Sequence, residues 1–343
     1  MVSSGIVPVI DFEPFLSGTP AEKEATAREL LKAAKEVGFL MLSNVDAVMD
    51  KATVAEAFKK TQQFFDLPME VKERLEWECA ESNRGYVAEG RERVTQETDP
   101  EAIAKLRQQA PDFKETMEIG KDYREGPDDS PYENRWPDAE FPDFKTFMNE
   151  FFEKNHQLHL EIMRALALAM GIGETFFDDK VAQRSHNLRL LNYPPIEKAK
   201  ILNGGNRAGS HSDYGSVTLL WQDMVGGLEV QDKDGHFVPA RPVADTVVVN
   251  VGDLLQRWSN DVLKSTIHRV VLPADGNPDE MTPRRNSIAF FSNPSLRTVI
   301  SALPGTGEPK YEPVETEAYL VKRLSETCAR SPRLDARAAE SPC

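Results

Sequence analysis

Apolar residues in the first half of the chain recur every three or four positions, which is the spacing of amphipathic helices. One such pattern starts at Thr19, an N-cap candidate that is followed by Pro20 at the first helical position and by Glu22 at the capping-box position. The pattern stops at Gly38, a residue type that commonly terminates helices. It therefore predicts a helix between Thr19 and Gly38.

The longest helical pattern covers residues 144–173 and ends in a glycine-containing segment. We expect this segment to form the central helix of the fold. His156 and His159 lie within it, and we expect both to be partly exposed helix residues. Residues 39–45 form a short apolar run that predicts a buried strand.

Residues 82–99 are charged and show no regular periodicity. Irregular segments of this length inside a compact domain are usually functional or disordered. Two interpretations stay open. The segment is either a solvated loop that carries Arg84, Tyr86, Arg91 and Arg93, or a lid that closes over a substrate.

From Asn187 onward, the pattern changes to short runs rich in β-branched residues, separated by Gly, Pro, Asn and Asp. Seven or eight closely spaced strands of this kind are typical of a sandwich, a barrel or a jelly roll. We therefore divide the chain into a mostly helical region (1–180), a β-rich core (181–325) and a tail (326–343) that we expect to be disordered.

Composition narrows the classes of partner. The chain has 343 residues, 40% of them hydrophobic, and a formal net charge of −15. That charge would repel a phosphate backbone, so we expect no nucleic-acid partner and no binding to anionic membranes. No apolar run approaches the roughly 18 residues that a membrane span needs, and the first residues do not resemble a signal peptide.

The three cysteines, Cys79, Cys328 and Cys343, are too few and too scattered for a disulfide framework or a thiolate zinc site. We expect free thiols and a cytoplasmic protein. The sequence contains neither a nucleotide-binding glycine motif nor a serine-hydrolase motif. A small molecule is the expected partner, and the composition sets no oligomeric state.

The segment GSHSDYGS (209–216) places His211 and Asp213 two positions apart, so both side chains can point to one side of a strand end or turn. His268 lies on a predicted strand of the same half, among β-branched residues. Two histidines and one carboxylate leave three positions open on iron(II), as in non-haem oxygenases, although zinc accepts similar ligands. A surface turn capped by the aspartate is the alternative.

The segment RRNSIAFF places Arg285 and Ser287 on one face of a strand that follows the His268 strand. The planar guanidinium suits bidentate binding of a carboxylate, and the serine hydroxyl adds a third donor. A surface ion pair is the alternative for Arg285. Because the residues that follow are apolar, an inward-facing arginine would need an anionic partner such as a dicarboxylate.

Together these motifs resemble those of the iron(II)- and 2-oxoglutarate-dependent dioxygenases, in the branch that includes isopenicillin N synthase. The resemblance rests on HSD at 211–213, on the histidine of STIHRVV and on the R-x-S of RRNSIAFF. VPVIDF near the N-terminus, YPP at 193–195, GGLEVQ and VNVGDLLQRWSND extend it over most of the chain. Within the branch, NRGYVAEGRERVTQETDPEAI is similar to thymine 7-hydroxylases.

The resemblance implies a mainly β core, a double-stranded β-helix or jelly roll, flanked by helices from the N-terminal half. It implies that His211, Asp213 and His268 are the catalytic iron(II) ligands. It also implies that Arg285 and Ser287 bind the distal carboxylate of 2-oxoglutarate.

Tyr193 matches a tyrosine that binds the same co-substrate in this family. Asn286 stands where the family has a tyrosine, but we expect this position to point away from the site. For the substrate, we expect Arg189, Tyr214 and Phe291 to face the pocket, a set that suits a flat polar ring. An internal salt bridge for Arg189 and core packing for Phe291 remain alternatives.

We therefore expect an oxygenase that uses Fe(II), 2-oxoglutarate and O2 to hydroxylate or desaturate a small organic molecule, with release of succinate and CO2. A pyrimidine such as thymine is one candidate substrate, and a secondary metabolite is another. Two further interpretations stay open. One is an isopenicillin N synthase-like oxidase that needs no 2-oxoglutarate, and the other is a non-catalytic binding protein, which would be expected to have lost a ligand.

Overall fold

The computed structural model describes residues 6–77, 82–90, 112–123, 132–198, 207–272 and 280–327. Its helices are α1 (Glu13–Ser17), α2 (Pro20–Glu36), α3 (Lys51–Phe65), α4 (Met69–Arg74), α6 (Phe144–Met170), α8 (Asp253–Trp258) and α9 (Thr316–Thr327). Its strands are β1 (Val9–Asp11), β2 (Phe39–Ser43), β3 (Gly85–Val87), β4 (Glu115–Ile119), β5 (Asn187–Tyr193), β6 (Ala208–His211), β7 (Val217–Gln222), β8 (Leu228–Gln231), β9 (Phe237–Pro239), β10 (Thr246–Val251), β11 (His268–Val270), β12 (Arg285–Ser292), β13 (Val299–Ile300) and β14 (Val314–Glu315).

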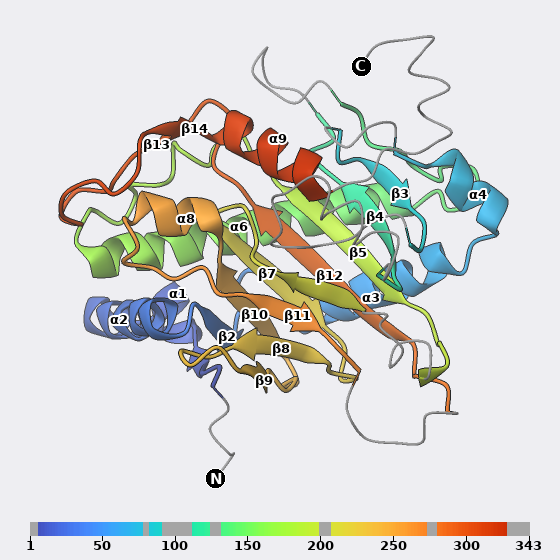
Figure 1. The fold of residues 1–343 in the computed structure, drawn as a ribbon, viewed down its shortest axis with the longest axis horizontal. Coiled ribbons are helices and arrows are strands. Elements are labelled where there is room, and N and C mark those ends of the chain that lie inside the picture. Colours follow the sequence, from blue (N-terminus) through green and yellow to red (C-terminus); the bar gives the residue numbers. More distant parts are fainter. Residues whose placement is uncertain are drawn as a thin grey trace.

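Two sheets form the core (Figure 1). The larger has eight strands in the order β1-β2-β10-β7-β12-β5-β4-β3, and the smaller has four in the order β6-β11-β8-β9. A pocket is lined by residues of both sheets, including Tyr193 and Arg285 from the larger and His268 from the smaller. The core is therefore the expected jelly roll, and the pocket lies between its two sheets.

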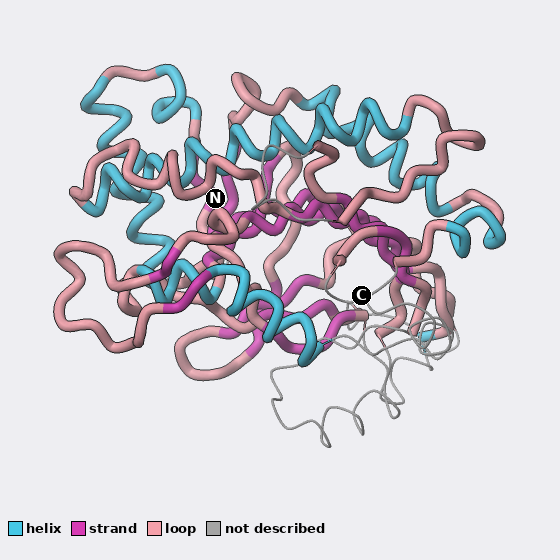
Figure 2. Tube along the Cα trace, turned by 90° about the horizontal axis from the view of Figure 1, so that it is seen from above, coloured by secondary structure: helices cyan, strands magenta, loops and turns pink. Residues whose placement is uncertain are grey.

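Helices cover the outer side of the larger sheet. The long helix α6 packs against α2, β7 and β12, and α3 packs against β5 and β12. Seen from above, the strands lie between the long helix on one side and the C-terminal helix on the other (Figure 2). Within the described segments, none of the helices has the length and apolar character that a membrane span requires.

Several predicted elements are confirmed by their local chemistry. The Thr19 hydroxyl accepts a hydrogen bond from the Glu22 amide, and the Glu22 carboxylate accepts one from the Thr19 amide, so α2 begins with the expected capping box. Helix α6 ends at Gly171, whose φ of 71° is left-handed and favours glycine. The apolar run after α2 is β2, whose first four residues are buried.

The region around residue 85 differs from the expected loop. Gly85–Val87 is a strand, β3, which pairs with β4, an element that the sequence pattern did not reveal. Arg84 and Tyr86 are buried rather than solvated, so the solvated-loop interpretation is wrong for both. Arg91 and Arg93 lie outside the described residues.

The chain end also differs in part. Helix α9 continues to Thr327, so the first two residues of the predicted tail are helical. Residues 328–343 lie outside the described segments, as do all three cysteines. Leu320 and Leu324 of α9 line the pocket, which places this helix beside the site.

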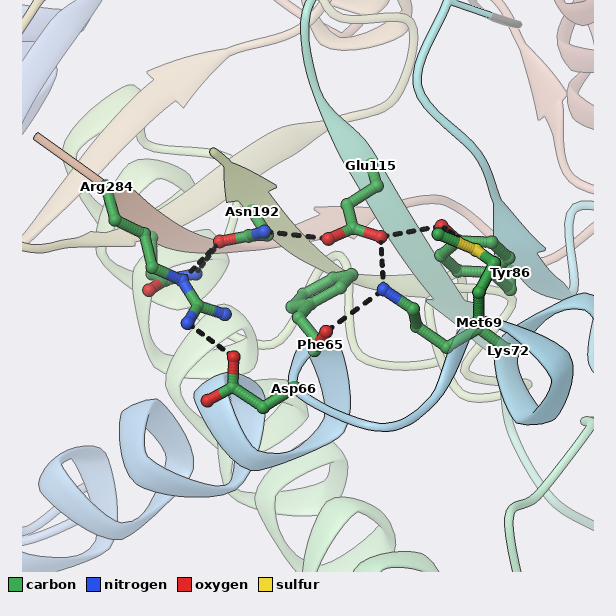
Figure 3. Close-up of polar contacts among 9 residues, drawn as sticks. Phe65, Asp66, Met69, Lys72, Tyr86, Glu115, Asn192 and Arg284 are labelled. Atoms are coloured by element: carbon green, nitrogen blue, oxygen red, sulfur yellow. Dashed lines mark hydrogen bonds and ion pairs between the residues drawn. The ribbon is translucent and has the colours of Figure 1, made fainter. Parts of the chain in front are cut away.

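A buried polar network ties α3 and α4 to the outer face of β4, β5 and β12 (Figure 3). Glu115 accepts hydrogen bonds from Lys72, Tyr86 and Asn192 at 2.6–2.9 Å. Arg284 donates to the Asn192 side-chain oxygen and pairs with Asp66. The network fixes the strand ends that carry Tyr193 and Arg285 on the opposite face, because successive strand residues point to opposite sides.

Candidate metal centre and co-substrate pocket

His211, Asp213 and His268 converge at one end of the pocket. His211 ends β6, His268 begins β11, and the two are direct partners across this antiparallel pair. Each histidine Nε2 atom lies 3.8 Å from Asp213 Oδ1. The strand pairing and the turn after β6 therefore bring three predicted ligands to one point.

Neighbouring backbone groups orient both rings. His211 Nδ1 lies 2.8 Å from the Gly209 carbonyl, and His268 Nδ1 lies 3.2 Å from the Thr266 carbonyl. A carbonyl only accepts hydrogen bonds, so each Nδ1 carries the proton and each Nε2 keeps its lone pair. Both lone pairs are available to a metal ion.

The carboxylate is oriented in the same way. Asp213 Oδ2 accepts hydrogen bonds from Thr218 at 2.6 Å and from Asn250 at 2.8 Å, which leaves Oδ1 facing the two histidines. Asn250 was not predicted as a site residue, although a polar side chain within the apolar strand VVVNV could have indicated it. The donor set of two imidazoles and one carboxylate fits iron(II) with open positions.

The surroundings of His211 and Asp213 favour the protonation states in which these two side chains bind a metal ion. Burial and the adjacent His268 lower the pKa of His211 to about 3, so its ring is neutral. Burial alone would raise the pKa of Asp213, but His268, His211 and the hydrogen bonds from Thr218 and Asn250 lower it overall. A neutral imidazole at His211 beside an ionised carboxylate at Asp213 matches the protonation states that a divalent metal requires of its ligands.

Alternate residues of β5 and β12 form the opposite wall of the pocket. Arg285 pairs in register with Tyr193, and Ser287 with Leu191. Arg285 is 1% exposed, and its Nη1 donates to Ser287 Oγ and its Nε to the Gly226 carbonyl. Its Nη2 has no partner among the described residues, and its Cζ lies 4.8 Å from the centre of the Tyr193 ring.

The Arg285 Nη2 donor without a partner among the described residues supports the assignment of a carboxylate ligand to this part of the pocket. A buried guanidinium nitrogen without a partner is costly, and a carboxylate in the pocket would satisfy it. The surface ion pair considered for Arg285 is therefore wrong. The adjacent Asn286 bonds to Leu191 and Asn192 on the outer face, as expected.

The predicted substrate residues also line the pocket. Arg189 forms an ion pair with the fully buried Glu118 at 2.6 Å, so its internal salt bridge is confirmed even though it faces the pocket. Arg189 Cζ lies 5.2 Å from the centre of the Phe291 ring. Tyr214 follows the metal-site aspartate, and Arg323 of α9 stacks over its ring.

Four groups in or beside the pocket were not among the predicted site residues. Asn187 donates to Glu118 at 2.6 Å, while its buried Oδ1 has no partner among the described residues. Asn83 also presents a buried Oδ1 without a partner in the described segments, and Lys114 lines the same pocket. Glu118 carried no signal, because β4 itself was not recognised.

A second histidine cluster lies beneath the larger sheet. His156, His159 and His186 are all buried, so the expected exposure of the two helix histidines is wrong. The Asn293 amide donates to His186 Nδ1 at 3.0 Å, so His186 Nε2 carries the proton and donates to His156 Nδ1. Since His186 Nε2 has no free lone pair, this cluster is a hydrogen-bonded chain and a poorer metal site than the first.

The buried cluster predicts a pH-dependent stability. Burial, assisted by Arg184, lowers the pKa of His156 to about 4, and burial lowers the pKa values of His159 and His186 as well. Below about pH 6.5 the unfolded chain binds more protons than the folded one, so the free energy of unfolding falls as pH decreases from about 6.5 toward 4. Each histidine contributes up to about 1.4 kcal/mol per pH unit.

Urea unfolding of the metal-free protein between pH 7 and pH 5 measures this slope. His156→Gln should reduce it, whereas His236→Gln should change it little, because the His236 side chain is 79% exposed and solvent weakens its ion pair with Asp232. Equal slopes for the wild type and His156→Gln would contradict the assignment.

Profiles of known protein families match both halves of the chain. Residues 185–294 match the profile of the 2OG-Fe(II) oxygenase superfamily, and residues 7–139 match the N-terminal region of the non-haem dioxygenases in morphine synthesis. A 2-oxoglutarate-dependent dioxygenase of Dothideomycetidae sp. (strain 11243) is 34% identical over 305 residues, covering 87% of this chain and 88% of that protein. A proline hydroxylase of Petromyces alliaceus is 35% identical over 328 residues, covering 93% and 98%.

A solved structure is similar over nearly the same length. The full-length Neurospora crassa thymine 7-hydroxylase in complex with alpha-KG and thymine has a TM-score of 0.83 and 44% sequence identity. The match covers 93% of this chain and 96% of that one.

Proposed function

This chain belongs to the 2OG-Fe(II) oxygenase superfamily and is a 2-oxoglutarate-dependent dioxygenase, and from that premise we propose that it oxidises a pyrimidine or a similar planar imide. The observation that carries the substrate class is the buried Asn187 Oδ1, an acceptor with no partner among the described residues.

Different residues of the pocket bind the metal ion and the co-substrate in this proposal. We assign iron(II) to His211, Asp213 and His268, and the distal carboxylate of 2-oxoglutarate to Arg285 and Ser287. When bound, the metal and 2-oxoglutarate supply the oxidising power, because O2 oxidises the substrate while the keto acid is decarboxylated to succinate.

The protein contributes position and shielding. Tyr193 packs beside the Arg285 guanidinium and limits where the co-substrate can lie. Leu320 and Leu324 of α9 line the pocket, and their apolar side chains favour the exclusion of water when a substrate is bound. His211 and His268 belong to the smaller sheet and Arg285 to the larger one, and all three line the same pocket, which suits a ligand with an anionic group at each end.

The orientation of Asn187 is fixed by its neighbour. The ionised Glu118 carboxylate can only accept hydrogen bonds, so the Asn187 side chain must turn its NH2 group toward it. The Asn187 carbonyl oxygen is then left without a partner in the described part of the chain. Asn83 offers a second carbonyl oxygen of this kind in the same pocket. Buried acceptors of this kind favour a substrate with N–H donors.

The aromatic residues add a shape preference. Phe291 and Tyr214 both line the pocket, and aromatic faces suit a flat ring. A pyrimidine dione carries two N–H donors and two carbonyl acceptors, which complement Asn187, Asn83 and the cationic Arg189. The thymine-bound structure of the Neurospora crassa relative supports this choice.

Oxidation of a fungal-type secondary metabolite is the second candidate. Relatives at 34–35% identity include a proline hydroxylase and other 2-oxoglutarate-dependent oxygenases of fungi. Such substrates differ widely in shape, and proline has no planar imide. A substrate panel that includes thymine, uracil and proline therefore separates the two candidates by product formation and succinate release.

Asn187→Ala should raise the KM for thymine by about tenfold, because one buried hydrogen bond is worth roughly 1.4 kcal/mol. Thymine methylated at the nitrogen that faces Asn187 should be a poor substrate for the wild type and show no further loss with Asn187→Ala. Asn149→Ala removes an asparagine that also donates to a carboxylate, but on α6 outside the pocket, and serves as the control. If thymine and uracil give no product while another substrate class does, the pyrimidine proposal is wrong.

A further inference from the structure

We propose that Arg207 is a second cation of the co-substrate site, which acts through Tyr193 and through its charge to raise the affinity for a dianionic keto acid. The inference rests on the assignment of the 2-oxoglutarate carboxylate to Arg285. Arg207 is a positioning residue, because it does not line the pocket itself.

Arg207 lies immediately before β6 and is 1% exposed. Its Nη2 donates to the Pro283 carbonyl at 2.9 Å, two residues before Arg285, and its Nε has no partner among the described residues. Its Cζ lies 5.7 Å from the centre of the Tyr193 ring, and Arg285 Cζ lies 4.8 Å from the same centre. The Tyr193 ring is therefore in contact with two buried guanidinium groups.

Arg207 and Arg285, the two cations beside Tyr193, have no acidic partner among the described residues, whereas the adjacent Arg284 has one. In the described part of the chain, no Asp or Glu forms an ion pair with Arg207 or Arg285. The adjacent Arg284 shows the contrast, because it points to the outer face and pairs with Asp66 (Figure 3). The described residues thus neutralise the arginine outside the pocket and supply no counter-ion to the two beside Tyr193.

Burial makes the charge of Arg207 costly. It lowers the pKa of Arg207 to about 10, and repulsion from Arg285 adds to this effect. Tyr193 and Asp223 act in the opposite direction, but the Asp223 carboxylate already accepts hydrogen bonds from the amides of Asn286 and Val225. Two like charges in a buried site are unfavourable until an anion binds near them.

Removal of the Arg207 charge should therefore weaken the binding of 2-oxoglutarate but raise the free energy of unfolding of the unliganded protein. An anion at Arg285 relieves the repulsion, so removal of the second cation weakens anion binding. The same removal abolishes the repulsion in the unliganded protein, which should become more stable. A residue with a purely structural role would lower both quantities when it is replaced.

The test uses the iron(II)-loaded protein under anaerobic conditions and measures the binding of two keto acids by titration calorimetry. 2-Oxoglutarate carries the distal carboxylate, and 2-oxovalerate has the same chain length without it. Arg207→Met should weaken 2-oxoglutarate binding about tenfold and leave 2-oxovalerate binding unchanged. Arg207→Lys, which keeps the charge, should stay within about threefold of the wild type.

Urea unfolding of the metal-free protein without keto acid gives the second readout. Arg207→Met should be at least as stable as the wild type, whereas Arg164→Met, which removes an arginine of α6 that pairs with Asp178 and does not line the pocket, should be less stable and keep its 2-oxoglutarate affinity. Equal losses for both keto acids, or wild-type binding by Arg207→Met, would overturn the inference. Failure of the wild type to bind 2-oxoglutarate, or wild-type binding by Arg285→Gln, would instead overturn the proposed site itself.

Discussion

Asp213→Ala should abolish turnover and iron binding while leaving the fold intact. Asp213 Oδ1 lies 3.8 Å from the Nε2 atoms of both His211 and His268, and it is the only carboxylate of this described cluster. Loss of a residue that only hydrogen-bonds to a metal ligand typically costs about 10- to 100-fold in metal affinity or activity. Loss of a direct ligand should therefore cost more. Iron content after anaerobic reconstitution and product formation under O2 measure both effects.

The fold has no comparable dependence on this carboxylate. The hydrophobic core is formed elsewhere, so Asp213→Ala should retain the far-UV circular dichroism of the wild type. Asp234→Ala, at an exposed position in the turn between β8 and β9, is the matched control and should keep full iron content. Normal iron content and turnover in Asp213→Ala would exclude the proposed triad.

Arg285→Gln should raise the 2-oxoglutarate concentration required for half-maximal turnover by about two orders of magnitude or more. A guanidinium makes two charge-assisted hydrogen bonds to a carboxylate, each worth roughly 1.5–3 kcal/mol, and each 1.4 kcal/mol corresponds to about a factor of ten. Arg285→Lys keeps the charge without the planar fork and should fall between. Ser287→Ala should cost about tenfold.

Iron binding without co-substrate separates this effect from a general disturbance of the site. Neither Arg285 nor Ser287 belongs to the metal-binding cluster, so both variants should retain wild-type iron affinity. Turnover of Arg285→Gln at low 2-oxoglutarate would place the co-substrate elsewhere. It would favour the oxidase that needs no keto acid.

The metal and co-substrate residues could be predicted because their spacing is local and their chemistry is specific. His211 and Asp213 are two residues apart, as are Arg285 and Ser287, and that spacing places each pair on one side of a strand or strand end. His268 needed tertiary information, since its pairing opposite His211 arises from the register of β6 and β11. The motif resemblance supplied that information.

Long-range pairing explains what the sequence pattern missed. Strand β4 is a run of five residues that contains two glutamates, Glu115 and Glu118, which resembles an exposed segment. Both are buried because Lys72 and Arg189, distant in the sequence, supply the compensating charges. The Asn187 carbonyl oxygen lacks a partner among the described residues because its NH2 group donates to Glu118. This orientation could not be predicted from the sequence, because the burial of Glu118 was not predicted either.

The exposure of the helix histidines was predicted wrongly for a related reason. His156 and His159 looked like surface residues because histidine is polar, yet α6 is the central helix and buries most of its faces. Their polar atoms are satisfied in part by His186 and Ser216, which no helical periodicity reveals.

Anaerobic titration of the wild-type protein with Fe(II) and 2-oxoglutarate tests the central assignment most directly. The chelate of iron(II) with a 2-keto acid gives a weak visible charge-transfer band that neither component produces alone. We predict that the band appears when both are added, saturates at about one equivalent of each per chain, is absent in Asp213→Ala, and requires far more 2-oxoglutarate in Arg285→Gln. A band of undiminished intensity in Asp213→Ala, or no band in the wild type at saturating Fe(II) and 2-oxoglutarate, would contradict the account.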